Sequence, residues 1–296
     1  MDNPEAPLPV SSIPSVTLNN GAQIPQLGFG VWQVPDAEAT AAVHAAIQAG
    51  YRSIDTAAIY ENEAGTGQAI AQALAGGVAR EDLYITTKLW NSGTRDWSGE
   101  QGRDAVLREF DASLAKLGLD YVDLYLIHWP RPMHGSYANV WKAFEQLAAD
   151  GRAKSVGVSN FGQEQLTRLL DESSVVPVLN QVELHPYFPQ DELRAFHAEH
   201  GIATEAWSPL GQGKDLLAEP ALLQIAEKHG RTVAQVVLRW HLQSGVIAIP
   251  KSVTPSRIKE NLDVAGFELD AADIAAIAGI ATGQRIGPDP QGFDWN

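Results

Sequence analysis

The stretch GYRSIDTAAIYENEAGTG, residues 50–67, decides how the rest of this chain is interpreted. A short apolar run ends at Asp55, and Tyr60 follows five positions later, ahead of a segment of helical composition. The pattern predicts a strand, a loop and then a helix. A carboxylate and a phenol held at the edge of a core indicate proton chemistry. A helix-capping Asp and a half-buried Tyr would explain this stretch alone about equally well.

Outward from this stretch, eight strand-like apolar runs alternate with segments of helical periodicity. The runs are Leu27–Trp32, Arg52–Asp55, Leu83–Lys88, Val122–His128, Ala153–Ser159, Val178–Gln181, Ile202–Trp207 and Val246–Lys251. Apolar strands that alternate with amphipathic helices pair in parallel, with helices covering the sheet. We therefore predict an α/β fold, a closed (β/α)8 TIM barrel, with an open doubly wound sheet as the alternative.

Several segments lie outside this alternation. Asn19-Asn20-Gly21 predicts an N-terminal β-hairpin, because Asn-Gly supplies the positive φ angles of a tight turn. Extra helices are expected near Val233–Trp240 and Asp270–Ile280, followed by a C-terminal loop at 281–296. We expect residues 1–13 to be a flexible N-terminal leader and residues 14–296 to form a single barrel domain.

Composition limits the classes of function. The chain has 296 residues, a formal net charge of −15 and no cysteine. The negative charge argues against nucleic acid and anionic membranes as partners. The absence of cysteine excludes disulfides and thiolate chemistry. Because the leader has no apolar core segment, we expect a soluble, cytoplasmic protein, which we take to be monomeric.

The carboxyl ends of the predicted strands collect residues that can do chemistry. Barrel enzymes place their active sites at this end. The residues found there are Trp32, Asp55, Lys88, His128, Ser159, Asn160, Gln181, Trp207, Ser208, Lys251 and Ser252. No single member requires a functional role, but the set as a whole predicts an active site.

Asp55, Tyr60, Lys88 and His128 form a plausible proton-donating group. Burial raises the pKa of a phenol, and a neighbouring ammonium lowers it, so Lys88 would make Tyr60 a better acid near neutral pH. Asp55 would keep Lys88 charged, and His128 would orient the substrate oxygen. Such a group suits protonation of an oxygen when hydride reaches a carbonyl carbon, and the hydride must come from a cofactor.

The sequence around residue 251 indicates which cofactor. Residues 249–257, IPKSVTPSR, read as a strand, a basic loop and a helix that starts with Thr254 at the N-cap. Lys251, Ser252 and Arg257 could converge on one phosphate, which is expected after strands seven and eight of a barrel. Trp207 offers its face to a flat ring such as nicotinamide. The loop at 208–214 could wrap a pyrophosphate.

Three separated stretches resemble the aldo-keto reductase family: GYRSIDTAAIYENEAG at 50–65, GVSNF at 157–161 and IPKSVTPSRIKEN at 249–261. The similarity extends through YITTKLW at 84–90 and LIHWP at 126–130 and covers the chain from about residue 14 to the tail. It implies that Asp55, Tyr60, Lys88 and His128 are the catalytic tetrad, with Tyr60 as the acid.

The resemblance also implies a binding site for NADPH/NADP+. Ser159, Asn160 and Gln181 would hold the nicotinamide carboxamide under Trp207. Lys251, Ser252 and Arg257 would hold the adenosine 2′-phosphate, so NADPH should be preferred over NADH, and Glu260 and Asn261 would face the adenine. The remaining members of the implied cofactor-binding set are Ser208, Pro209, Leu210, Gln212, Val253 and Thr254.

The implied substrate is a small-molecule carbonyl compound. AWSPLGQGK at 206–214 resembles bacterial 2,5-diketo-D-gluconate reductases, so keto-sugar acids and small aldehydes such as methylglyoxal are candidates. Trp32, Trp90 and Trp129 are expected to wall the substrate site. The alternatives are an NADPH-binding protein without turnover, a Schiff-base lyase using Lys88, and a barrel glycosidase using Glu183 and Glu205.

Some motifs have a structural rather than a functional interpretation. Gly65-Thr66-Gly67 lacks the strand–GxGxxG–helix context and is interpreted as part of a packed helix. No Ser or Thr follows Lys214, so residues 211–214 are not a P-loop. His197 and His200 are interpreted as a solvated helix face, and no metal is expected. Trp141 and Trp240 fit helix-core positions.

Overall fold

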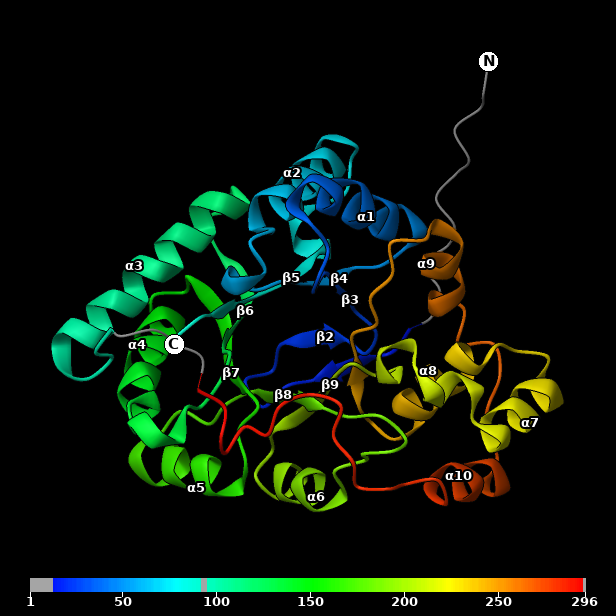
Figure 1. Cartoon of the computed structure of the whole chain (residues 1–296). Helices are drawn as coiled ribbons and strands as arrows, with labels where there is room; N and C mark the ends of the chain where they lie inside the picture. Colours follow the sequence, from blue (N-terminus) through cyan, green and yellow to red (C-terminus); the bar gives the residue numbers. More distant parts are fainter. Residues whose placement is uncertain (1–12, 92–94, 295–296) are drawn as a thin grey trace.

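The computed structural model describes residues 13–91 and 95–294 and shows a parallel eight-stranded barrel (Figure 1). The strands follow one another around the sheet in chain order. They are β3 (Phe29–Gly30), β4 (Ser53–Asp55), β5 (Tyr84–Leu89), β6 (Val122–Ile127), β7 (Ala153–Ser159), β8 (Leu179–Glu183), β9 (Ala203–Trp207) and β10 (Ile247–Ala248). The first and last strands are joined by backbone hydrogen bonds, for example from Gly28 N to Ala248 O at 2.9 Å. This closure confirms the predicted barrel and excludes the open sheet.

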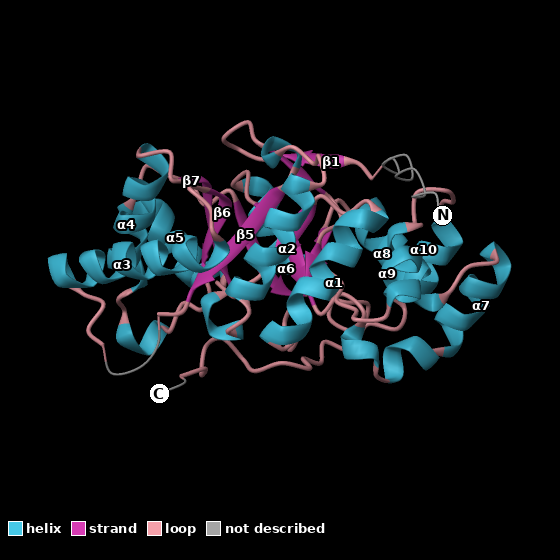
Figure 2. Cartoon of the chain, turned by 90° about the horizontal axis from the view of Figure 1, so that it is seen from above, coloured by secondary structure: helices cyan, strands magenta, loops and turns pink. Residues whose placement is uncertain are grey.

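Helices surround the strands on the outside of the barrel (Figure 2). They are α1 (Asp36–Ala49), α2 (Glu63–Ala75), α3 (Gly99–Leu117), α4 (Tyr137–Ala149), α5 (Gln163–Glu172), α6 (Asp191–Glu199), α7 (Pro220–His229), α8 (Val233–Gln243), α9 (Pro255–Leu262) and α10 (Ala271–Ala278). Their apolar sides face the sheet; Trp141 on α4 and Trp240 on α8 are buried, as predicted. In the part of the chain that the structure describes, no helix has the length and apolarity needed to cross a membrane.

A β-hairpin closes the amino end of the barrel. It pairs β1 (Ser15–Thr17) with β2 (Gln23–Pro25) in antiparallel fashion, and Gly21 in its turn has a φ of +87°. Its side chains Leu18 and Ile24 belong to the same buried cluster as Leu124 and Ile247 from the strands. The hairpin therefore leaves the carboxyl end of the strands as the open one.

Two strands are shorter than the sequence predicts. The runs Leu27–Trp32 and Val246–Lys251 contribute only the two-residue strands β3 and β10. The flanking residues still take part in the closure, since Gly30 N donates to Pro250 O at 3.0 Å. Pro250 has no N–H to donate, which limits how far a regular ladder can continue at this seam.

The glycines of the 50–67 stretch serve helix packing. A Cβ on Gly67 would lie 2.5 Å from Leu117 O at the end of α3, and one on Gly65 would lie 2.4 Å from Asp36 O at the start of α1. Side chains at these positions would push the helices apart. The packed-helix interpretation of Gly65-Thr66-Gly67 is thus confirmed.

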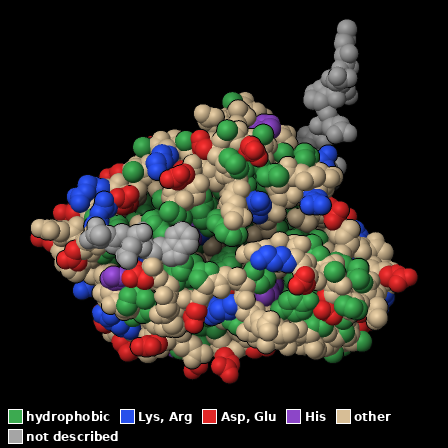
Figure 3. Space-filling view, viewed as in Figure 1, with side chains coloured by type: hydrophobic (Ala, Val, Ile, Leu, Met, Phe, Trp, Pro, Cys, Tyr) green, Lys and Arg blue, Asp and Glu red, His purple; other side chains and the backbone are tan. Residues whose placement is uncertain are grey.

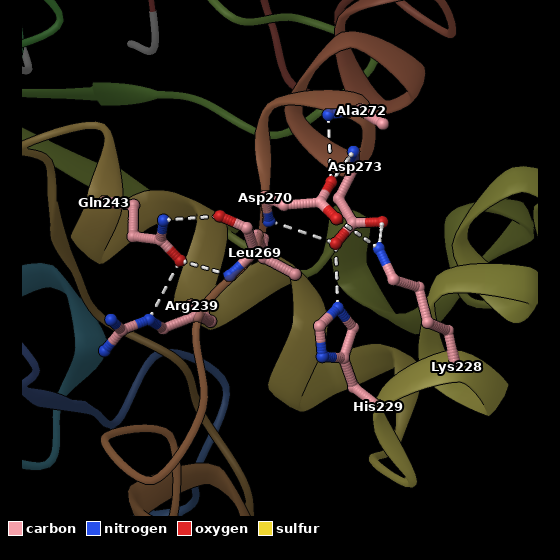
Figure 4. A network of polar contacts seen from close by, with 8 residues as sticks. All are labelled: Lys228, His229, Arg239, Gln243, Leu269, Asp270, Ala272 and Asp273. Carbon is pink, nitrogen blue, oxygen red and sulfur yellow. Dashed lines mark hydrogen bonds and ion pairs between the residues drawn. The ribbon is translucent and has the colours of Figure 1, made fainter.

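A polar network links the end of α7 to the start of α10 (Figure 4). Asp273 accepts hydrogen bonds from Lys228 Nζ at 2.8 Å and pairs with His229 Nε2 at 2.7 Å. Asp270 caps α10 by accepting from the backbone N–H groups of Ala272 and Asp273. The network fixes α10, from which the C-terminal tail departs.

Candidate active site

The carboxyl ends of β4, β5 and β6 bring three of the predicted titratable residues together. Lys88 is fully buried on β5, and its Nζ donates to Asp55 Oδ1 at 2.5 Å and to Thr56 O at 2.9 Å. Tyr60 ends a short 3₁₀ turn, Ala58–Tyr60, that follows β4. The Lys88 ammonium lies 5.1 Å from the centre of the Tyr60 ring, and the His128 ring lies 5.6 Å from it. The four predicted residues therefore form one cluster.

The protonation states of this cluster follow from burial and charge. Burial lowers the pKa of Lys88, but Asp55 and Tyr60 raise it, and the net direction is upward. Burial raises the pKa of Tyr60, and Lys88 opposes that rise without cancelling it. Near neutral pH, Lys88 is therefore an ammonium and Tyr60 a neutral phenol that can donate its proton. A charged Lys88 is not a Schiff-base nucleophile, which disfavours the lyase alternative.

His128 is buried and neutral. Burial and the nearby Lys88 charge hold its pKa well below the usual range. Its Nδ1 has no hydrogen-bond partner among the residues that the structure describes. A neutral imidazole carries one N–H donor and one acceptor nitrogen, so it suits hydrogen bonding to an uncharged substrate oxygen.

Ser159, Asn160 and Gln181 lie beside this cluster and are hydrogen-bonded to one another. Ser159 Oγ donates to Gln181 O at 2.8 Å, and Asn160 Nδ2 donates to Ser159 Oγ at 3.1 Å and to His128 O at 3.0 Å. Asn160 adopts a left-handed φ of +65°, which turns its side chain back over the strand ends. The three residues thus form a rigid polar shelf next to the tetrad.

The Trp207 indole contacts this shelf through its nitrogen-bearing edge. Its Nε1 donates to Asn160 Oδ1 at 2.8 Å, and a Cβ on Gly287 of the C-terminal tail would lie 2.5 Å from its ring. Only a glycine allows the tail to pass so close to the indole. The tail is fastened there because Glu183 Oε2 accepts a hydrogen bond from Gly287 N at 3.0 Å.

Aromatic residues stand beyond His128. Trp90 contacts the His128 ring at 5.4 Å, and Trp129 stacks on Phe293 of the tail at 3.9 Å. Trp32 is 44% exposed, more than the other two predicted wall residues. In the space-filling view, hydrophobic side chains line a hollow in the middle of this face (Figure 3). Phe293 was not predicted, although an aromatic residue in a tail rich in Gly and Pro was a usable signal.

The predicted phosphate site forms the start of α9. Thr254 is at the N-cap position and Pro255 at the first helical position, although the Thr254 side chain makes no capping bond. Lys251 and Arg257 are exposed, and neither is in an ion pair with a residue of the described ranges. Ser252 Oγ accepts from Thr254 N at 3.1 Å. Two cations that pair with no described carboxylate, on so acidic a chain, suit an anionic group.

The other predicted cofactor residues lie in two segments, the loop after β9 and the start and body of α9. Ser208 and Gln212 have φ of +49° and +58°, so the loop after β9 is tightly turned. Glu260 accepts from Thr232 Oγ1 at 2.8 Å, and Asn261 is buried. The remaining members lie in the same two segments: Pro209, Leu210 and Val253.

One interpretation of the sequence is wrong. His197 does not lie on a solvated helix face; it is fully buried, with Nε2 3.0 Å from Asn180 Nδ2 and Nδ1 2.9 Å from Thr204 Oγ1. The helix turns His197 toward the strands, which the three-residue spacing to His200 does not reveal. No group of three or more His, Asp or Glu suited to a metal ion occurs in residues 13–91 and 95–294.

The two glutamates considered for a glycosidase have other partners. Glu183 holds the tail and pairs with His185 Nε2 at 3.0 Å. Glu205 is fully buried inside the barrel and accepts from Gln181 Nε2 at 2.8 Å. Neither carboxylate is left exposed to flank a sugar.

Fold and site together define a closed β/α barrel with a buried Lys–Asp pair next to a tyrosine. The aldo/keto reductase family model matches residues 25–282. An aldo-keto reductase of Mycolicibacterium smegmatis is 56% identical over 282 residues, covering 95% of this chain and 98% of the relative. The methylglyoxal reductase DkgA of Escherichia coli is 49% identical over 279 residues, covering 94% and 97%.

Solved structures agree with this match. The aldo/keto reductase from Brucella melitensis superposes with a TM-score of 0.84 at 55% identity, covering 91% of this chain and 98% of that one. A variant of Gox0644 in complex with NADPH gives a TM-score of 0.88 at 46% identity, covering 96% and 100%. The chain belongs to the aldo/keto reductase family. Members of this family use a nicotinamide cofactor and act on small carbonyl compounds.

Proposed function

We propose that this protein reduces aldehydes and ketones to alcohols with NADPH, and that Tyr60 is the general acid. The observation that carries the proposal is the fully buried Lys88 ammonium, 2.5 Å from Asp55 and 5.1 Å from the Tyr60 ring. A buried ammonium beside a phenol has a clear chemical use, because it stabilises the phenolate that remains after the proton has left.

The residues present fit a nicotinamide dinucleotide phosphate. Lys251 and Arg257, exposed cations at the start of α9 that pair with no carboxylate of the described residues, suit the 2′-phosphate. The polar shelf of Ser159, Asn160 and Gln181 suits a carboxamide beside the face of Trp207. When bound, this cofactor supplies the hydride. The structural relative that binds NADPH supports the same choice.

The chain's own residues account for the rest of the reaction. The neutral His128 ring orients the carbonyl oxygen next to the Tyr60 hydroxyl. Tyr60 gives its proton to that oxygen as negative charge develops on it, and Lys88 stabilises the resulting phenolate. Asp55 keeps Lys88 charged and fixed. The proton is then restored from solvent at the open end of the barrel.

For the substrate, we propose small 2-oxoaldehydes and keto-sugar acids. Trp90 and Trp129 both contact Phe293, and the three rings form an aromatic wall beside His128. A relative about half identical to this chain is named a methylglyoxal reductase. The test ranks methylglyoxal, 2,5-diketo-D-gluconate and aromatic aldehydes by kcat/KM, following the absorbance of NADPH. Failure to oxidise NADPH with any of them would exclude the reductase and leave a protein that only binds the cofactor.

A further inference from the structure

A second buried carboxylate lies beneath the tetrad. Glu205 on β9 is fully buried and is the Cα partner of Gln181 on β8. Gln181 Nε2 donates to Glu205 Oε2 at 2.8 Å and to Asp55 Oδ2 at 2.9 Å. One amide group therefore joins Glu205 to the carboxylate that holds Lys88.

This arrangement fixes the orientation of the Gln181 amide. Asp55 is the ion-pair partner of Lys88 and can only accept, so the amide nitrogen must face it. Both N–H groups of Gln181 are then committed, one to each carboxyl group. Its Oε1 accepts no hydrogen bond from the described residues, so Gln181 can offer a ligand an acceptor but no donor. Without Glu205, one N–H would lose its partner and the amide could rotate.

Glu205 also contributes a charge that can change. Its Oε1 has no hydrogen-bond partner among residues 13–91 and 95–294, so nothing on that side stabilises the ionised form. The titratable groups that act on it or feel its charge are Asp55, Lys88 and Tyr84. Burial and the Asp55 charge raise the pKa of Glu205 to about 8, against smaller effects of Gln181 and Lys88.

We propose that Glu205 is a positioning residue for carbonyl reduction: it locks the Gln181 amide and, when it ionises, weakens the ability of the tetrad to release a proton. The inference rests on the proposed function. An ionised Glu205 adds negative charge next to Asp55 and Lys88, so the interior that must accept the Tyr60 phenolate already carries one more negative charge. Because burial keeps the pKa of Tyr60 above its usual value, Tyr60 itself stays protonated while Glu205 loses its proton.

The test uses Glu205→Gln and Glu205→Leu, with single-turnover rates of NADPH oxidation measured from pH 6 to 9.5. In the wild type the rate should fall with a midpoint near pH 8. Glu205→Gln keeps the acceptor oxygen but cannot ionise, so this fall should vanish. Glu205→Leu should lose about tenfold in rate at every pH, because the released amide is misplaced, and Glu205→Gln should recover most of that loss.

Two readouts do not depend on turnover. The infrared band of a neutral carboxylic acid should be present in the wild type at pH 6, weaken toward pH 9 and be missing from Glu205→Gln. NADPH affinity, from quenching of tryptophan fluorescence, should weaken in Glu205→Leu more than in Glu205→Gln.

The matched control is Glu63→Gln. Glu63 is also buried, but it accepts a hydrogen bond from Thr87 Oγ1 at 2.6 Å and lies near Lys116 of the outer helix α3. It should keep the wild-type pH profile.

An unchanged alkaline fall in Glu205→Gln, or a wild-type rate in Glu205→Leu, would overturn the assignment of Glu205 while leaving the reductase intact. A wild type that binds no NADPH and reduces no carbonyl compound would instead overturn the proposed function. The two failures are therefore distinguishable.

Discussion

Two effects act on the pKa of Tyr60 in opposite directions: burial raises it and the Lys88 charge lowers it. Replacing it by Phe removes the proton donor but keeps the ring next to Lys88 and His128. We expect Tyr60→Phe to lose about a hundredfold to ten-thousandfold in kcat, with NADPH affinity nearly unchanged. Steady-state kinetics together with fluorescence titration of NADPH check both parts. A variant that keeps its full turnover would remove Tyr60 from the role of acid.

Arg257 tests the choice between the two dinucleotides. Its guanidinium is exposed and in no ion pair with the described residues, so its loss should cost little unless a phosphate binds there. We expect Arg257→Ala to raise the Kd of NADPH by about tenfold or more and to leave that of NADH nearly unchanged. Arg231→Ala serves as the control, because Arg231 is already paired with Asp263. Equal losses for both dinucleotides would contradict the 2′-phosphate role.

At the scale of elements, the C-terminal tail acts as a wall of the site. It is fastened by Glu183 at Gly287 and by Arg131 at Asp294, and between them Phe293 stacks on Trp129. We expect Phe293→Ala to lower kcat/KM for small aldehydes and to raise it for bulky aromatic ones, because the wall recedes. The ratio of the two constants is the measurement. Phe267→Ala, which alters a ring packed against Arg231 away from the site, should leave that ratio unchanged.

The network between α7 and α10 predicts that the stability of the protein depends on pH in the acidic range (Figure 4). Burial raises the pKa of Asp273, but the hydrogen bonds from Lys228 and His229 outweigh burial, so the net direction is downward. A carboxyl whose pKa is lower in the folded state stabilises the protein above its unfolded pKa of about 3.9 and loses that contribution as pH falls further. Asp273→Asn should therefore melt a few degrees lower at pH 7 and show a smaller drop between pH 5 and pH 3. Asp263→Asn, in a more exposed ion pair, is the comparison, and equal shifts in both variants would argue against the network.

For the whole molecule, two buried histidines predict a broader loss of stability. Burial lowers the pKa of His197 to about 4 and that of His241 to about 3. Both are neutral when folded and take up a proton when unfolded below about pH 6.5. The free energy of unfolding should therefore fall as pH decreases from about 6.5 to 4, measured by urea denaturation. His197→Gln should flatten part of this decline; an unchanged slope would show that other groups cause it.

The sequence supported the barrel because its alternation of strands and helices has few topological solutions, and it supported the tetrad because Asp55, Lys88 and His128 end successive strands. It could not supply facts that depend on how distant segments meet. The burial of His197, the contact of Phe293 with Trp129 and the bridge from Glu205 to Asp55 all join residues from separate elements. Local periodicity carries no record of such contacts.

The β1–β2 hairpin covers the amino-terminal opening of the barrel with Leu18 and Ile24. It thereby covers the barrel on the side away from the site, and the carboxyl of residue 205 is fully buried between the two. Proton exchange at so deeply buried a carboxyl depends on brief local openings of the surrounding structure. Its charge should therefore respond to a sudden change of pH more slowly than that of an exposed carboxyl, and a pH-jump experiment would measure the delay.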